Sequence, residues 1–224
     1  PQGGLISPIL ANVYLHYVLD LWFEKCIKKQ LYGEAYLVRF ADDFLIMFQY
    51  ERDAQRVYEA IIKRMELFGL ELSKEKTRIL PFGRNCGTRE TFDFLGFTHF
   101  NSKTRKDYYT VGHKISRKKK KQFKSNLKKW VKENRNTQFD EFMKALNKKL
   151  TGSFNYYSLS GMIKEVRNLW IHSLYVTFKW MNRRSQRRSF KLDRFYEIWN
   201  DRIIHPYIHV DIWSGDKVIY NKNV

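Results

Sequence analysis

Two adjacent acids, Asp42 and Asp43, are the residues of this sequence best placed to do chemistry. They stand between two apolar runs, residues 36–40 and 44–48, whose composition predicts two strands joined by a very tight turn. Such a hairpin holds both carboxylates at its tip, where their hard oxygen atoms suit Mg²⁺. The alternative is an ordinary Asp-Asp turn, because aspartate is a common turn residue.

Further motifs surround this pair in a defined order. The chain opens with Pro-Gln-Gly-Gly-Leu-Ile-Ser-Pro-Ile-Leu-Ala-Asn at residues 1–12, and residues 40–43 read Phe-Ala-Asp-Asp. Residues 69–77 read Gly-Leu-Glu-Leu-Ser-Lys-Glu-Lys-Thr, and residues 92–97 read Phe-Asp-Phe-Leu-Gly-Phe. Together these motifs resemble those of reverse transcriptases and, more narrowly, of the reverse transcriptase/maturase proteins that group II introns encode.

The resemblance implies a role for each acid. Asp42 corresponds to the main metal ligand of the family's palm, and Asp43 supports it. Polymerases of this type use two Mg²⁺ ions, which activate the attacking oxygen and stabilise the leaving one. The family takes a further carboxylate from an earlier palm strand, which we expect to precede Pro1. We therefore expect the isolated chain to be inactive as a polymerase.

The resemblance also implies residues near the nucleotide and the primer. The expected nucleotide-binding residues are Gln2, Phe40, Ala41 and Lys76, and the expected primer grip is Phe94, Leu95 and Gly96. The residues by themselves leave other roles open. Gln2 could be a polar loop residue, Lys76 a solvated surface charge, and the primer-grip motif a short buried hairpin.

The net charge of +19 is confined to one part of the chain. The first 100 residues carry 13 lysines and arginines and 13 acids, whereas residues 101–224 carry 29 and 10. This asymmetry predicts a polyanionic partner for the second half. Nucleic acid fits better than a membrane, because no stretch is a clean basic amphipathic anchor.

The composition excludes several protein classes. The two cysteines, Cys26 and Cys86, have no metal-ligand spacing, so neither a zinc site nor a disulfide framework is expected. No apolar run approaches the roughly 20 residues of a membrane span, and no signal peptide is visible. We expect a cytoplasmic protein of the bacterial type.

Apolar spacing predicts the helices. Ser7 as N-cap and Pro8 start a helix to about residue 29, and a second runs over 51–68 until Gly69. Residues 70–82 suggest a turn and a strand. A basic helix is expected within 103–132. A further helix is expected over 137–150, which Thr137 caps and Gly152 ends, and another over 161–182. Residues 150–157 resemble the start of a maturase (X) domain, and 180–189 its basic terminal helix segment.

Cations cluster where RNA contacts are expected. Lysines are strongly hydrated point charges, while arginines bind phosphate through paired hydrogen bonds. The predicted RNA-binding residues are Arg117, Lys118, Lys119, Lys120, Lys121, Lys124, Arg183, Arg184, Arg187 and Arg188. The alternative for each is a solvated surface charge.

We therefore predict an α+β protein with two parts. Residues 1–100 form a partial polymerase palm, an antiparallel sheet with two packed helices, and residues 101–224 form an all-α thumb/maturase bundle. The predicted function is part of an RNA-directed DNA polymerase that also binds and helps to splice its intron RNA. Its predicted partners are group II intron RNA, an RNA template with a DNA primer, and a missing fingers/palm segment or a second copy. The alternative is a non-catalytic RNA-binding splicing factor.

Overall fold

The chain forms two compact units, Pro1–Leu95 and Gly96–Val224, and each is described by itself. The computed structural model describes residues 4, 6–73, 75–84, 86–187 and 189–211. Its helices and two small antiparallel sheets confirm the predicted α+β class.

The first unit begins with a helical run that changes its winding. It consists of α1 (Ser7–Leu15), the π-helical turns η1 (His16–Asp20) and η2 (Phe23–Ile27), and a final 3₁₀ turn, η3 (Lys28–Gln30). One helical run was predicted here, but the N-cap is Ile6 and not Ser7. The predicted apolar stripe also fails in α1, which buries no side chain. The buried residues Val18 and Phe23 lie five apart, the spacing that shares a face when the helix widens to i→i+5 bonds.

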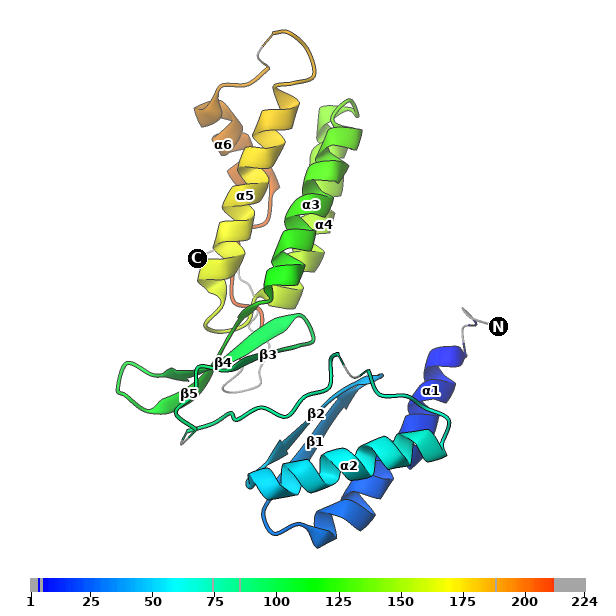
Figure 1. Cartoon of the computed structure of the whole chain (residues 1–224). Coiled ribbons are helices and arrows are strands. Elements are labelled where there is room, and N and C mark those ends of the chain that lie inside the picture. The colour runs from blue at the N-terminus through cyan, green and yellow to red at the C-terminus, as the bar shows by residue number, and fades with distance from the viewer. Residues whose placement is uncertain (1–3, 5, 74, 85, 188, 212–224) are drawn as a thin grey trace. The chain divides into compact units, whose positions relative to one another are not determined.

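The hairpin and its covering helix follow. Strands β1 (Ala35–Phe40) and β2 (Asp43–Phe48) pair antiparallel from Ala35↔Phe48 to Phe40↔Asp43. Side chains alternate between the two faces of the hairpin. One face packs with α2 (Glu51–Leu67) and the helical run around a core of Val18, Leu19, Phe23, Ala35, Val57, Ile61 and Met65 (Figure 1).

The end of α2 is as predicted. Gly69 has a φ of +68°, and its N–H and that of Leu70 donate to the carbonyls of Glu66 and Met65. This is the Schellman arrangement, in which glycine relieves the strain of the left-handed residue. The strand predicted within residues 70–82 is wrong, because the described residues of that segment adopt turns and irregular backbone. Among these described residues the backbone hydrogen bonds are local, such as the bond from the Thr77 N–H to the Ser73 carbonyl. Their backbone groups therefore do not pair with a neighbouring strand.

Three short strands form the second sheet, in the order β3-β4-β5. They are β3 (Thr91–Phe94), β4 (Phe97–Lys103) and β5 (Tyr109–Ile115). No strand was predicted at β5, because the cations from Lys103 onward were assigned to one basic helix, so the all-α prediction for residues 101–224 is wrong at β4 and β5. The strands nevertheless pair over seven residues, from Phe97↔Ile115 to Lys103↔Tyr109.

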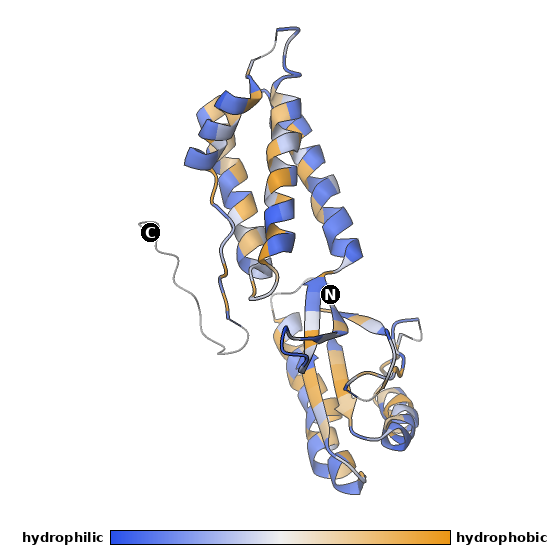
Figure 2. Ribbon diagram, turned by 90° about the vertical axis from the view of Figure 1, so that its left-hand side faces the viewer, coloured by the Kyte–Doolittle hydropathy of each residue, from blue (hydrophilic) through white to orange (hydrophobic). Residues whose placement is uncertain are grey.

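The second unit is built around a larger core. Its helices are α3 (Arg117–Asn134), α4 (Phe139–Tyr157), α5 (Ile163–Met181) and α6 (Leu192–Arg202). Each shows alternating apolar and polar segments (Figure 2), and their apolar sides meet in one cluster that includes Leu127, Leu146, Leu169 and Trp199. The predicted basic helix and the helix at 161–182 are confirmed.

Three expectations about this unit need correction. Helix α4 starts after Gln138 and not Thr137, and it continues through Gly152 to Tyr157, because burial of Phe154 extends its apolar side. The terminal helix expected over 180–189 is wrong, since α5 ends at Met181 and the described residues 183–187 and 189 are non-helical. Helix α6, which buries Phe195 and Trp199, was not predicted.

Candidate active site and nucleic-acid interface

The tip of the β1–β2 hairpin consists of Ala41, Asp42 and Asp43. Phe40 and Asp43 are the last paired residues, so Ala41 and Asp42 form a two-residue loop. Ala41 has a φ of +55°, a left-handed conformation that two-residue hairpin loops usually give to glycine or asparagine. The predicted tight turn is therefore confirmed.

Both tip carboxylates are available to a ligand. Asp42 and Asp43 are exposed, and neither side chain makes a hydrogen bond or ion pair with any part of the chain that the structure describes. Their oxygen atoms fit a divalent cation, which prefers hard ligands. No cluster of three or more His, Cys, Asp or Glu residues capable of holding a metal occurs among the described residues. The tip thus offers two ligand residues, and water or another group must supply the rest.

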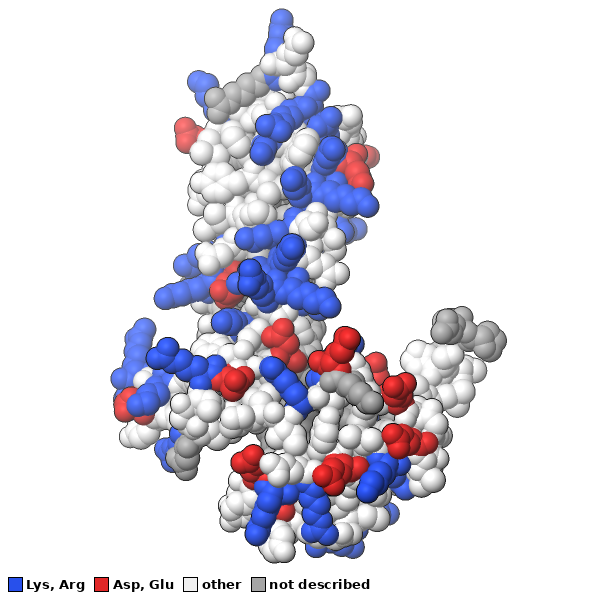
Figure 3. Space-filling view, viewed as in Figure 1, with Lys and Arg blue, Asp and Glu red and all other residues white. Residues whose placement is uncertain are grey.

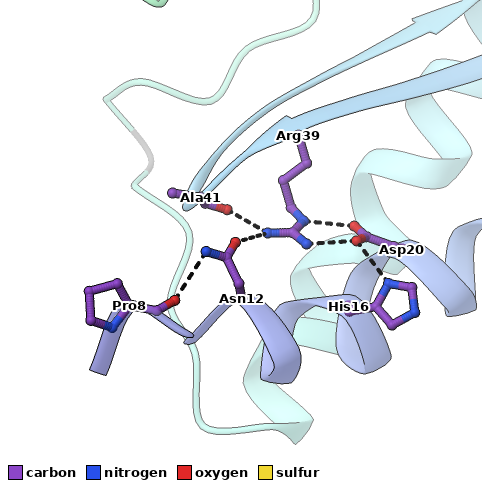
Figure 4. A network of polar contacts seen from close by, with 6 residues as sticks. All are labelled: Pro8, Asn12, His16, Asp20, Arg39 and Ala41. Carbon is purple, nitrogen blue, oxygen red and sulfur yellow. Dashed lines mark hydrogen bonds and ion pairs between the residues drawn. The ribbon is translucent and has the colours of Figure 1, made fainter. Parts of the chain in front are cut away.

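A polar network that was not predicted joins the tip to the helical run (Figure 4). The Arg39 Nε–H and Nη2–H donate to the two carboxylate oxygens of Asp20 at 2.8 and 2.7 Å. Arg39 Nη1 donates to Asn12 Oδ1 and to the Ala41 carbonyl, each at 2.9 Å. His16 Nδ1 lies 3.3 Å from Asp20 Oδ2.

This network changes the acidity of its members. The hydrogen bonds from Arg39 lower the pKa of Asp20, against an opposing effect of burial, and His16 adds to the lowering. The bond to Asp20 in turn raises the pKa of Arg39. One sequence signal could have shown that Arg39 needs a partner, although not which one. Arg39 alternates with Ala35 and Leu37 on the inner face of β1, where a charge needs a partner.

The other predicted nucleotide-binding residues are less closely assembled. Phe40 is 64% exposed on the outer face of the hairpin, next to Ala41. Lys76 is exposed in a turn where its backbone N–H donates to the Ser73 carbonyl, and its ammonium makes no ion pair within the described segments. Gln2 lies outside the described residues. The structure therefore joins only Phe40 and Ala41 directly to the acids.

The predicted primer-grip residues form a second tight turn. Leu95 and Gly96 have φ values of +50° and +83°, as a type I′ loop between β3 and β4 requires. The Gly96 carbonyl accepts a hydrogen bond from Ser116 N–H at 2.9 Å. A Cβ at Gly96 would lie 3.5 Å from Lys119 Cγ and from Tyr157 Oη, an ordinary contact distance. The glycine is thus required by its φ and not by lack of space.

Helix α3 presents a row of cations. Its positions i, i+4, i+7, i+11 and i+15 share one side of a helix. We call this set the α3 stripe, and it consists of Arg117, Lys121, Lys124, Lys128 and Lys132, all of them exposed. Lysine and arginine side chains gather along α3 in Figure 3. A continuous positive row of this kind suits a phosphate backbone.

The remaining lysines of this helix differ in their surroundings. Lys118 and Lys119 are exposed, and Lys119 lies beside Gly96. Lys120 instead points inward and forms an ion pair with Glu165 of α5. If Lys120 contacts RNA as predicted, it must give up its ion pair with Glu165.

The predicted arginines follow α5 and surround a tryptophan. Arg183 is exposed, and its guanidinium carbon lies 5.6 Å from the centre of the Trp180 ring. Lys132 and Arg135 lie 5.8 and 5.5 Å from the same ring, within cation–π range. We call this group the Trp180 cluster, and it consists of Trp180, Lys132, Arg135 and Arg183. It was not predicted from the sequence.

The other arginines of this segment contribute unequally. Arg184 is half-buried, since its Nε donates to the Met181 carbonyl at 3.3 Å and its guanidinium lies 6.0 Å from the Phe139 ring. Arg187 is exposed, and Arg188 lies outside the described residues. Arg183 and Arg187 are therefore the better candidates for phosphate contacts.

The pKa of His172 in α5 is affected by this positive surface. Burial and, to a smaller extent, the charge of Lys124 lower the pKa of His172. Both effects disfavour the protonated ring, because desolvation and a like charge each oppose an added positive charge.

The outer face of the first unit is apolar and uncovered within the described structure. Tyr36, Val38, Phe40 and Met47 of the hairpin are 44–64% exposed. Helix α1 likewise exposes Ile9, Leu10 and Val13. Contiguous apolar surface of this kind marks a site where another surface binds.

Comparison with known proteins finds a match for the first unit. The family model described as reverse transcriptase (RNA-dependent DNA polymerase) matches residues 1–99. No curated protein matches the chain. Among the described helices, none is both long and apolar enough for a membrane span. The match supports the reverse transcriptase family for the stretch that carries Asp42 and Asp43, and residues 100–224 lie outside it.

Proposed function

We propose that this chain is the second half of the palm and the thumb of a group II intron reverse transcriptase, an RNA-directed DNA polymerase with maturase activity. The observation that carries this proposal is the hairpin tip. Asp42 in the two-residue loop and Asp43 at the start of β2 are both exposed, and neither has a side-chain partner among the described residues. Both lie within the stretch that matches the reverse transcriptase family model.

In this proposal the tip holds divalent cations. Asp42 and Asp43 would bind Mg²⁺, which when bound supplies the charge that activates a primer 3′-hydroxyl and stabilises the leaving pyrophosphate. Phe40 and Ala41 lie next to the acids and would contact the nucleotide. Lys76, from its exposed turn, would balance charge on the phosphates. Leu95 and Gly96 would guide the primer strand past their turn.

The isolated chain would lack part of this machinery. The family resemblance implies one more carboxylate for the two-metal site, which another polypeptide segment would supply. The exposed outer face, with Val38, Phe40 and Met47, offers apolar surface to which such a segment could bind. That segment would be an upstream part of the same polypeptide or a partner chain.

Primer extension tests the polymerase proposal. We expect no template-dependent DNA synthesis by the 224-residue chain with Mg²⁺, an RNA template and an annealed DNA primer. Synthesis that Asp42→Ala abolishes would disprove the predicted incompleteness while supporting the role of Asp42. If a polypeptide that also contains the upstream segment extends the primer, Asp42→Ala should remove that activity. Undiminished extension by this variant would refute the metal-binding role.

A second function is favoured by the α3 stripe. The chain could act as an RNA-binding splicing factor in which the hairpin is only scaffold. RNA affinity that survives Asp42→Ala, falls steeply with salt, and falls when Arg183, Arg184, Arg187 and Arg188 are changed to Gln would support this reading for the isolated chain. The two functions are compatible, because they use different units.

A further inference from the structure

Arg39 occupies an unusual position for a charged residue. It lies on the face of β1 that packs toward the core, yet its guanidinium is almost fully hydrogen-bonded. Nε and Nη2 reach both oxygens of Asp20 in η1, a paired geometry that holds the fork in one orientation. This leaves Nη1 directed at two further acceptors, Asn12 Oδ1 in α1 and the Ala41 carbonyl in the tip.

The acceptor in the tip is the peptide that leads directly into Asp42. Ala41 bears its Cβ at a φ of +55°, a conformation that costs an L-residue energy and persists only where its surroundings hold it. The Arg39 Nη1–H bond to the carbonyl of this same residue orients the Ala41–Asp42 peptide plane. The direction of the Asp42 side chain depends on that plane.

We propose that Arg39 is a positioning residue that aims the Asp42 and Asp43 carboxylates. Asp20 and Asn12 orient Arg39, and Arg39 orients the turn. We call these three side chains and the Ala41 carbonyl the Arg39 clamp. The Arg39 clamp fixes the geometry of the tip, and its consequence for metal binding rests on the proposed function.

The shape of the guanidinium distinguishes a positioning role of Arg39 from a simple ion pair with Asp20. A lysine at position 39 keeps one positive charge for Asp20, but its ammonium has no fork that reaches Asp20 and Ala41 together. A purely stabilising ion pair would therefore tolerate Arg39→Lys. A positioning role would not, and Arg39→Lys should affect the tip nearly as much as Arg39→Gln.

Amide hydrogen exchange of the full chain, followed by NMR, tests the clamp directly. In Arg39→Lys we expect exchange at residues 40–44 to rise about fivefold, the factor set by one hydrogen bond of ordinary net strength. Exchange in α2 should stay unchanged. Glu24→Gln is the matched control, because it breaks the exposed Lys28–Glu24 pair in the same helical run without touching the tip.

The outcomes decide the proposal. Exchange that rises only at the tip in Arg39→Lys supports the clamp, and unchanged exchange at the tip overturns it. An even rise over β1, β2 and α2 also overturns it, since Arg39 would then be a general stabilising residue. Should Arg39→Lys fail to fold, Asn12→Ala replaces it. That variant removes one of the two Nη1 acceptors and the bond from Asn12 Nδ2 to the Pro8 carbonyl in α1, and it should raise exchange at the tip by a smaller factor.

A second measurement separates the clamp from the metal site. Mn²⁺ added to the wild-type chain should broaden the signals of Asp42 and Asp43, and this broadening should weaken in Arg39→Lys. If Mn²⁺ broadens no signal at the wild-type tip, the proposed metal role of this chain fails. The exchange result then still decides the clamp. Equal broadening in wild type and Arg39→Lys would show that Arg39 does not aim the carboxylates.

Discussion

The two units treat their apolar side chains differently. In the second unit α3, α4, α5 and α6 turn their apolar sides into one cluster, and the exposed side of α3 carries mainly lysine and arginine. In the first unit a small core lies beneath the hairpin, while Val38, Phe40 and Met47 above it and Leu10 of α1 remain exposed. The first unit therefore offers apolar side chains to a binding partner, whereas α3 of the second unit offers positive charge.

The largest expected effect tests whether this difference in packing is real. Leu146 in α4 is 0% exposed and Leu10 in α1 is 62% exposed, so the same helical Leu→Ala change can be made in both units. Leu146→Ala should lower the free energy of unfolding by about 2–5 kcal/mol, because it leaves a cavity. Leu10→Ala should change it by less than about 0.5 kcal/mol. Denaturant unfolding, followed by hydrogen exchange in peptides from each unit, measures both.

Similar losses in the free energy of unfolding for the two variants would contradict the difference in packing between the units. A large loss in Leu10→Ala would mean that α1 is already packed against something in solution. A second copy of the chain would be one such surface, and sedimentation at several concentrations would reveal it.

The next effect concerns the cationic surface of the second unit. Changing Lys121, Lys124, Lys128 and Lys132 to Gln should weaken binding to single-stranded RNA. If each lysine neutralises one phosphate, the slope of log affinity against log salt should become shallower by about 3. The matched control changes Lys25, Lys29, Lys63 and Arg84, four exposed cations of the first unit, and should leave the slope nearly unchanged. Equal loss in both variants would contradict a specific role for the α3 stripe.

Substituting two glycines of the second unit should change its stability by smaller amounts and in opposite directions. Gly152 lies inside α4 with open space around its Cα, so Gly152→Ala should stabilise the unit by up to about 1 kcal/mol. Gly161 precedes α5 with a φ of +85°, and Gly161→Ala should destabilise it by about 1 kcal/mol. Thermal unfolding followed by circular dichroism gives both signs. Destabilisation by Gly152→Ala would show that the helix needs a glycine there.

The smallest effect depends on pH. Because the pKa of His172 is lowered in the folded chain, the unfolded chain binds more protons just below the ordinary value of 6.5. The contribution of His172 to stability is therefore complete above pH 6.5 and declines as the pH falls toward the lower folded pKa. His172→Gln should flatten this part of the stability profile, measured by urea unfolding between pH 7.5 and 5. An unchanged profile would contradict the shift.

Local patterns predicted the parts of the structure that depend on local physics. Two apolar runs around Asp42 predicted the hairpin, since a two-residue loop leaves only one register. The stripe that includes Val57, Ile61 and Met65 predicted α2, and Gly69 predicted its end. Helix α6 also had a readable signal, the i, i+4 pair Phe195 and Trp199, but it was overlooked.

The remainder depends on how distant segments meet. The widening at η1 and η2 follows from burying Val18 and Phe23 together, which requires the hairpin to be in place. The bond between Arg39 and Asp20 joins residues that are 19 apart, and no spacing rule connects them. The Trp180 cluster combines α3 with the end of α5. The acids of the candidate site were thus predictable, whereas the groups that orient them were not.

The π-helical turns have a consequence for how this protein can vary. An i→i+5 turn holds one residue more than an i→i+4 turn, so the loss of one residue within His16–Asp20 can be absorbed by a return to α-helical winding. Asn12 would then keep its place opposite Arg39. Within α2, where no wider turn absorbs the change, the loss of one residue would turn the following part of the helix by about 100°. Single-residue deletions should therefore be better tolerated at η1 than in α2.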